Sequence, residues 1–136
     1  MMCKININST FSEIRLASEF LQQFCGKHNI AVETQGHLEL ILVEALNNVV
    51  EHAYQEKSDG NILIELKLVD NNTVIKITDE GIAAPGTVLI EGSNLPDENK
   101  LPEGGWGLCL IQALADTIEY FRYADHNTLV LTKGAA

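Results

Sequence analysis

The sequence has little positive charge and no long apolar run. Nine Lys and Arg residues face nineteen Asp and Glu residues, so the formal net charge is −10. This balance argues against nucleic acid or an anionic membrane surface as the main partner. It leaves open a basic protein partner or a nucleotide masked by magnesium. No apolar run approaches the about 20 residues of a membrane-spanning helix, and the N-terminal MMCKININST lacks the apolar segment of a signal peptide.

Cysteine is scarce as well, with Cys3, Cys25 and Cys109 scattered along the chain at no metal-ligand spacing. An odd number of isolated cysteines is typical of reduced thiols, so we expect a cytoplasmic protein in which they act as small buried hydrophobic residues. The 136 residues, 46% of them hydrophobic and 21% charged, suit a single globular domain over residues 1–136. No repeat or internal linker divides the chain.

Residue periodicity predicts helices over residues 10–27, about 34–54 and 106 to about 115. Strands are expected at CKINI, in the two halves of NILIELKLVDNNTVIKITD, at TIEYFRY and at TLVLTK. Residues 81–105 hold all three prolines and show little periodicity, which is typical of a functional or mobile loop. The expected fold is an α+β two-layer sandwich. A mostly antiparallel sheet of about five strands would be covered on one face by three helices.

The second predicted helix carries polar residues in its middle. At about 100° per residue, its apolar positions share one arc that should face the sheet: Leu38, Ile41, Leu42, Ala45, Val49 and Ala53. Glu44, Asn48 and Glu51 cluster beside that arc. Glu44 and Asn48 are four residues apart, so a carboxylate and an amide oxygen could together serve a divalent cation and a proton transfer. From this helix alone, a solvated polar stripe is equally open, and His52 fits a hydrogen-bonded residue at the core edge.

Two further stretches carry candidate ligand groups. Asp79 ends a β-rich run with Gly81 two residues later, so a carboxylate could accept from an exocyclic amine while the glycine admits a planar base. A plain turn is the alternative. Gly104, Gly105 and Gly107 stand where the long loop becomes a helix, where free backbone amides could face phosphate oxygens. The alternative is a flexible hinge. No Gly-Lys-Ser/Thr follows, so this is not a Walker motif.

In this order, the three motifs resemble those of the GHKL ATPase superfamily, and most closely those of its small anti-sigma factor serine/threonine kinases. EALNNVVEHAY is similar to the N-box, TDEG to the first glycine box, GGWGLCLI to the second, and NTLVLTK to the last strand. The resemblance covers nearly the whole chain. It implies a Bergerat-type ATP-binding fold with ATP and Mg²⁺ as ligands and an ATP lid at about residues 82–104.

The resemblance also implies roles for single residues. Glu44 would be the general base that activates the attacking hydroxyl, and Asn48 would be a magnesium ligand. Asp79 would accept from the adenine amino group. The other residues expected near the nucleotide are Gly81, Lys100, Gly104, Gly105, Gly107, Leu108 and Thr128, the last through an adenine-bound water.

Two functions follow from the resemblance. The first is an ATP-dependent kinase that phosphorylates a serine or threonine of a partner regulatory protein and thereby controls its binding. The second is a nucleotide-gated module that sequesters a sigma factor or another regulator with little or no catalysis. Glu44 favours the first, because a pure binding module needs no base. The acidic lid and its missing cation favour the second, since Lys100 is the only cation between residues 82 and 104 and Glu103-Gly104 stands where relatives often carry a basic residue. Ala83, where many superfamily members have another glycine, is a separate departure from the pattern.

The expected partners are an anti-sigma factor antagonist, a sigma factor or a similar regulator of transcription, with a homodimer left open. Neither direct nucleic-acid binding nor a membrane is expected. A histidine-kinase fragment fits poorly. None of His28, His37, His52 and His126 lies in a separate helical segment that could dimerise and accept phosphate.

Overall fold

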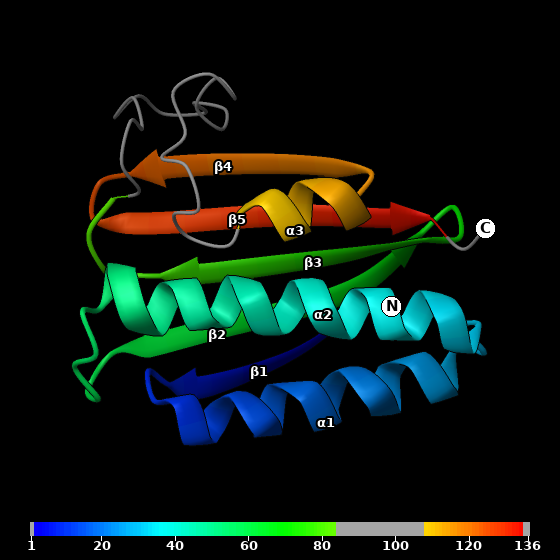
Figure 1. Ribbon diagram of the computed structural model, residues 1–136, viewed down its shortest axis with the longest axis horizontal. Helices are drawn as coiled ribbons and strands as arrows, with labels where there is room; N and C mark the ends of the chain where they lie inside the picture. The colour runs from blue at the N-terminus through cyan, green and yellow to red at the C-terminus, as the bar shows by residue number, and fades with distance from the viewer. Residues whose placement is uncertain (1, 84–107, 135–136) are drawn as a thin grey trace.

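The computed structural model describes residues 2–83 and 108–134, which form one antiparallel sheet and the helices packed on it (Figure 1). The five strands lie in the order β1-β2-β3-β5-β4. They are β1 (Met2–Asn8), β2 (Asn61–Val69), β3 (Asn72–Asp79), β4 (Thr117–Tyr123) and β5 (His126–Gly134). The helical elements are α1 (Phe11–Lys27), α2 (Val32–Asn48), the π-helical turn η1 (Val49–Ala53) and α3 (Leu108–Leu114).

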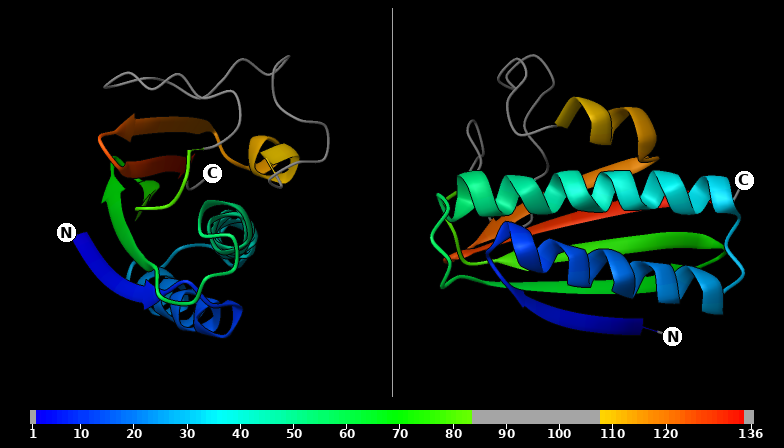
Figure 2. Two further views of the ribbon diagram at one scale, coloured as in Figure 1. Left: turned by 90° about the vertical axis from the view of Figure 1, so that its left-hand side faces the viewer. Right: turned by 60° about the horizontal axis from the view of Figure 1, so that its bottom comes forward.

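The three α-helices lie on the same face of the sheet, as the end-on view in Figure 2 shows. Side chains from both layers fill the space between them. The largest fully buried ones come from the three α-helices and from the three strands β2, β3 and β5: Leu21, Leu38, Ile41, Leu42, Leu46, Ile62, Ile64, Leu66, Ile75, Ile77, Ile111 and Leu131. The predicted α+β two-layer fold is therefore confirmed. Within the described ranges, no helix is long and apolar enough to cross a membrane.

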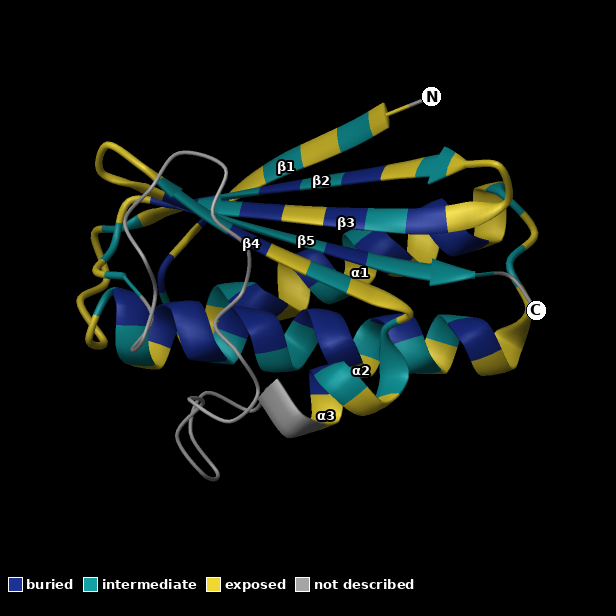
Figure 3. Ribbon diagram, turned by 90° about the horizontal axis from the view of Figure 1, so that it is seen from above, coloured by how far each residue is buried: buried dark blue, intermediate teal, exposed yellow. Residues whose placement is uncertain are grey.

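Local sequence signals explain several of the element boundaries. Thr10 caps α1, because its hydroxyl accepts a hydrogen bond from the Glu13 amide at 3.3 Å. Asp70 and Asn71 join β2 to β3 with φ angles of 51° and 68°. Positive φ at both central residues is typical of the tight turn that suits a hairpin, and Asp and Asn tolerate it. β1, the strand predicted at CKINI, lies at the edge of the sheet and alternates exposed and half-buried residues (Figure 3).

The second helix departs from its prediction at its C-terminal end. It begins at Val32 and changes at Val49 from α-helical to π-helical geometry. The amide of Tyr54 donates to the Val49 carbonyl at 2.9 Å, a bond that spans five residues where an α-helix spans four. A uniform period of 3.6 residues therefore fails here, and Ala53 and Tyr54 take directions that a helical wheel does not give.

The cysteines of the described residues behave as small hydrophobic groups. Cys25 is fully buried in α1, and burial, together with the charge of Glu39, raises the pKa of its thiol to about 11. Cys3 is half-buried and packs against the core from β1. A thiol with so high a pKa stays protonated and unreactive at neutral pH, which agrees with the expected role for Cys25.

Candidate functional site

Asp79 is a buried carboxylate at the end of β3, with 5% of its surface exposed. It follows Ile75 and Ile77 on the face of β3 that the helices cover, since alternate residues of a strand share a face. Its Oδ1 accepts two hydrogen bonds, from the amide of Gly81 and from Nδ2 of Asn127, each at 2.8 Å. Because both bonds from the described residues end on Oδ1, Oδ2 remains for a further donor.

The electrostatic balance at Asp79 is set mainly by burial, which raises the pKa of its carboxyl above the ordinary value. The hydrogen bonds from Asn127 and Gly81 act in the opposite direction, and so do the nearby side chains of Arg122 and His126. A buried carboxyl with a raised pKa next to specific polar partners is a common mark of a ligand site.

Asn127 is the partner of Asp79, and the sequence prediction missed it. It lies opposite Asp79 in the register of β3 and β5 and is 2% exposed. Its Oδ1 accepts from the Tyr120 hydroxyl at 2.7 Å and from Arg122 Nη1 at 2.9 Å. Two donors on the oxygen direct the amide nitrogen toward Asp79. The strand expected from periodicity, TLVLTK, begins one residue after Asn127, although the alternation of Asn127 with Leu129 and Leu131 could have indicated an inward-facing position.

The segment that follows Asp79 is held by the side-chain amide of Asn127 and by the guanidinium of Arg122. Asn127 Nδ2 lies 2.9 Å from the Ile82 carbonyl and 3.2 Å from the Gly81 carbonyl. Arg122 Nη1 donates to the Gly81 carbonyl at 2.7 Å. The backbone at residues 81–82 is thus fixed from β4 and β5 before the chain leaves the described residues at Ala83.

The segment at Gly81 also packs against the helix layer, at Ala53 of η1. The amide of Ile82 donates to the Ala53 carbonyl at 2.9 Å. A Cβ built on Gly81 would lie 2.5 Å from the Ala53 carbonyl carbon and nearer still to its oxygen. Only glycine therefore lets this segment pack on η1. This packing is a different reason for a glycine from the predicted approach of a planar base, which stays a prediction.

Glu44 and Asn48 lie on α2, in the turns that precede η1. Glu44 is half-buried, and Asn48 is 8% exposed. Asn48 directly precedes the π-helical turn η1, whose last residue, Ala53, contacts the segment beside Asp79. The structure therefore brings the polar end of α2 and the Asp79 carboxylate to the same end of the sheet (Figure 1).

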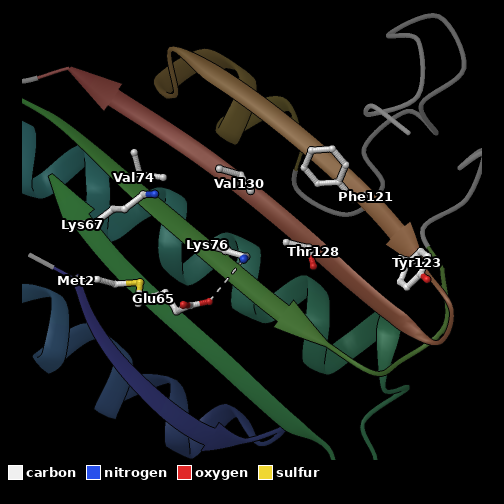
Figure 4. Close-up of a pocket in the computed structure, with 9 residues that line it drawn as sticks. All are labelled: Met2, Glu65, Lys67, Val74, Lys76, Phe121, Tyr123, Thr128 and Val130. Carbon is white, nitrogen blue, oxygen red and sulfur yellow. Dashed lines mark ion pairs between the residues drawn. The ribbon is translucent and has the colours of Figure 1, made fainter. Parts of the chain in front are cut away.

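Thr128, predicted to contact an adenine-bound water, lies on a different face of the sheet from Asp79. Thr128 follows Asn127 in β5, so its side chain projects from the opposite face of the sheet. It lines a hollow of about 490 Å³ on that helix-free face, together with Phe121 and Val130 (Figure 4). Successive strand residues alternate between faces, so Asn127 reaches Asp79 and Thr128 does not.

The remaining predicted ligand residues lie outside the described residues: Lys100, Gly104, Gly105 and Gly107, with the predicted lid from residue 84 onward. Leu108 begins α3 in the described backbone, but its side chain is outside the description. Across residues 2–83 and 108–134, no group of three or more His, Cys, Asp or Glu side chains could hold a metal ion.

Comparisons of sequence find similar proteins named serine-protein kinase RsbW and anti-sigma F factor. The chain is 31% identical to the serine-protein kinase RsbW of Oceanobacillus iheyensis over 103 residues, which cover 73% of this chain and 65% of the relative. The RsbW of Bacillus mycoides is 32% identical over 107 residues, 76% of this chain and 66% of the relative. The anti-sigma F factor of Heyndrickxia coagulans is 25% identical over 130 residues, which cover 93% of this chain and 83% of the relative. The chain thus spans slightly less than two thirds of the length of these RsbW relatives.

Comparisons of structure show the same fold. The RsbU and RsbW domains of a Mycobacterium tuberculosis protein match with a TM-score of 0.70 at 20% identity, over 98% of this chain and 32% of that one. A histidine kinase domain from Erythrobacter litoralis matches with a TM-score of 0.54 at 15% identity, over 92% of this chain and 60% of that one. A sequence model described as the histidine kinase-like ATPase domain matches residues 7–133. The match covers nearly the whole chain, which therefore belongs to the histidine kinase-like ATPase domain family, as its three motifs predict.

Proposed function

We propose that the protein is an ATP-dependent serine/threonine kinase of the anti-sigma factor type, which phosphorylates a partner regulatory protein and so controls its binding. Two relatives named serine-protein kinase support the reaction class. The observation that carries the proposal is the Asp79 carboxylate, buried at the end of β3 with Oδ1 engaged by two donors. A carboxylate held in this way has one oxygen to offer to a ligand that brings a donor.

Adenine supplies such a donor. Its exocyclic amine would donate to Asp79 Oδ2, while Asn127 holds Oδ1 and keeps the carboxylate from rotating. Guanine carries a carbonyl oxygen at the same ring position, which would face the carboxylate and leave both acceptors unpaired. Unpaired buried acceptors cost about 1–3 kcal/mol. The site should therefore prefer ATP to GTP.

Asn48 is the residue that would hold Mg²⁺. The donor set fits this ion, which prefers oxygen ligands and usually keeps several waters and substrate phosphates, so that one or two protein oxygens suffice. Bound there, Mg²⁺ would neutralise charge on the phosphates. Asn48 is buried in α2 one turn after Glu44, and the two side chains share a side of the helix.

Glu44 would act as the general base. The hydroxyl oxygen of the partner's serine or threonine attacks the γ-phosphorus, and the bond from that phosphorus to the β,γ-bridging oxygen breaks. The hydroxyl proton passes to the Glu44 carboxylate, and ADP leaves. The half-buried position of Glu44 suits this role, because the carboxylate stays accessible to a hydroxyl brought by another protein.

A second function has its own support. The anti-sigma F factor of Heyndrickxia coagulans is similar over 93% of this chain, and its name describes a protein that acts against a sigma factor. In that alternative the protein sequesters a sigma factor or another regulator when a nucleotide is bound, with little or no phosphoryl transfer. The formal net charge of −10 suits a basic partner surface in either case.

The decisive experiment compares wild-type protein with Glu44→Gln for transfer of labelled γ-phosphate from ATP to candidate partner proteins. We expect Glu44→Gln to bind ATP and the partner normally but to transfer phosphate about 10²–10⁴-fold more slowly. Glu51→Gln is the matched control, because Glu51 is an exposed acid in η1. Equal transfer by wild type and Glu44→Gln, or none by either, would exclude the kinase and leave the nucleotide-gated module.

A further inference from the structure

Tyr54 joins the helix layer to two strands through its hydroxyl group. The hydroxyl accepts a hydrogen bond from the amide of Glu80 at 2.7 Å and donates one to the carbonyl of Asn61 at 2.6 Å. Glu80 directly follows Asp79, and Asn61 is the first residue of β2. One side-chain oxygen therefore links the backbone next to the Asp79 carboxylate to the start of the neighbouring strand.

The position of the Tyr54 ring is determined by its surroundings. A Cβ built on Gly60 would lie 2.6 Å from Cδ1 and Cε1 of the ring, so the ring occupies the space that any other residue at position 60 would need. Ser9 fixes Gly60 in turn. The Ser9 amide donates to the Gly60 carbonyl at 2.9 Å, and the Gly60 amide donates to Ser9 Oγ at 3.0 Å. The ring thus rests on a segment that is itself held in place.

The π-helical turn brings Tyr54 to this position. Ala53 and Tyr54 hold the chain on the two sides of Gly81, because the Ala53 carbonyl accepts from the amide of Ile82 while the Tyr54 hydroxyl accepts from that of Glu80. In an unbroken α-helix these two residues would point elsewhere, since each residue turns the helix by about 100°. π-helical turns occur often at functional sites.

We infer that Tyr54 is a positioning residue for recognition of the nucleotide base: its hydroxyl holds the Glu80 amide and thereby directs Asp79 Oδ2 toward the exocyclic amine of adenine. The inference rests on the proposed function. Burial raises the pKa of the Tyr54 hydroxyl, so it stays protonated at neutral pH and keeps both of its hydrogen bonds. Tyr54 touches neither the base nor the phosphates in this account and acts only through the backbone next to Asp79.

The test uses Tyr54→Phe, which keeps the ring and removes the hydroxyl. Calorimetry would measure the Kd of wild type and variant for Mg-ATP and for the Mg complex of purine riboside triphosphate, which lacks only the 6-amino group. The Kd for purine riboside triphosphate divided by the Kd for ATP isolates the contribution of the amine. We expect this ratio to fall by about fivefold in Tyr54→Phe, the usual effect of losing one hydrogen bond. The affinity for purine riboside triphosphate should stay unchanged.

Tyr123→Phe is the matched control, because Tyr123 is 62% exposed at the end of β4 and should leave both affinities unchanged. An unchanged ratio in Tyr54→Phe, or an equal loss for both nucleotides, would overturn the inference and leave Tyr54 a structural residue. The proposed function fails separately, if wild-type protein binds neither nucleotide.

A second measurement needs no variant. Hydrogen exchange of the Glu80 amide in wild-type protein reports directly on its bond to Tyr54. If this bond positions Asp79, binding of ATP should slow exchange at Glu80 more than binding of purine riboside triphosphate does, because the coupling between the two sites is reciprocal. Equal exchange of the Glu80 amide with both nucleotides bound contradicts the inference, even if Tyr54→Phe does not fold.

Discussion

Asn127 Nδ2 donates a 2.8 Å hydrogen bond to Asp79 Oδ1, although the two residues are 48 positions apart in the sequence. Both side chains are buried, so neither can exchange its partner for water without opening the structure. The pair determines which carboxylate oxygen remains for a ligand. The predictions below test this arrangement and the roles proposed for the residues around it.

Asp79→Asn should bind ATP about tenfold or more weakly than wild type. The new amide can keep its oxygen toward Asn127 and Gly81, so the fold should tolerate the change. Its nitrogen then takes the place of Oδ2 and opposes the adenine amine, a mismatch worth about 1–3 kcal/mol. Calorimetry with Mg-ATP measures the loss. Unchanged affinity would remove Asp79 from the site.

The same variant should alter how stability depends on pH. Burial raises the folded-state pKa of Asp79 above its ordinary value of 3.8, so the folded state holds the proton where the unfolded state has lost it. The contribution of Asp79 to the free energy of unfolding therefore falls as pH rises from the ordinary pKa to the raised one. In urea unfolding, the free energy of unfolding of Asp79→Asn relative to that of wild type should be higher at pH 7 than at pH 4. A difference that does not change with pH would contradict this.

Asn127→Asp should destabilise the fold by about 2 kcal/mol or more at neutral pH, because it sets a second buried carboxylate against Asp79. The loss should shrink at pH 5, where one of the two acids can take up a proton. Thr128→Ala is the neighbouring control on the helix-free face and should change the free energy of unfolding by less than about 0.5 kcal/mol. Similar losses for both variants would argue against the assignment of Asn127 to the site.

Gly81→Ala should lower the free energy of unfolding by about 1–3 kcal/mol, since its methyl group would overlap the Ala53 carbonyl. Gly36→Ala is the matched control in α2, where a Cβ meets nothing within 4 Å. It should raise stability by about 0.5–1 kcal/mol, the usual gain of alanine over glycine in a helix. Chemical denaturation of the two variants decides the matter, and equal effects would refute the close packing at Gly81.

Asn48→Ala should weaken binding of Mg-ATP as well as phosphoryl transfer, whereas Glu44→Gln should affect transfer alone. The difference arises because a magnesium ligand holds the ion that bridges the phosphates, while a base acts only on the attacking hydroxyl. Titration of ATP with and without Mg²⁺ separates the two roles. If Asn48→Ala binds Mg-ATP as tightly as wild type, Asn48 is not the ligand.

The elements that the sequence predicted are those whose signals are local. The helix over residues 10–27, the strand at CKINI and the two strands in NILIELKLVDNNTVIKITD each depend on patterns among residues close together in the chain. The motifs around Asn48 and Asp79 were found in the same way, because their spacing is short. The structure then placed them at one end of the sheet, as a shared site requires.

The contacts that the sequence missed depend on packing between distant segments. Asn127 lies outside the predicted strand TLVLTK, because Asn favours turns and its partners Asp79 and Tyr120 belong to other strands. The change to π-helical geometry at Val49 could not be predicted from propensity, since it depends on how Ala53 and Tyr54 dock on the end of β3. Tertiary contacts overrode local preference at both places.

The π-helical turn makes this end of the helix sensitive to the number of residues in it. If the same residues Val49–Ala53 were wound with α-helical pitch, the residues after them would point in other directions, because each residue of an α-helix turns by about 100° and one of the wider π-helix turns by less. The Ala53 carbonyl would then turn away from Ile82, and the Tyr54 hydroxyl from Glu80, even if every other side chain were kept. Within EALNNVVEHAY, an insertion of a single residue before Val49 should therefore be tolerated less well than most substitutions, because it would change how Ala53 and Tyr54 meet the segment around Gly81.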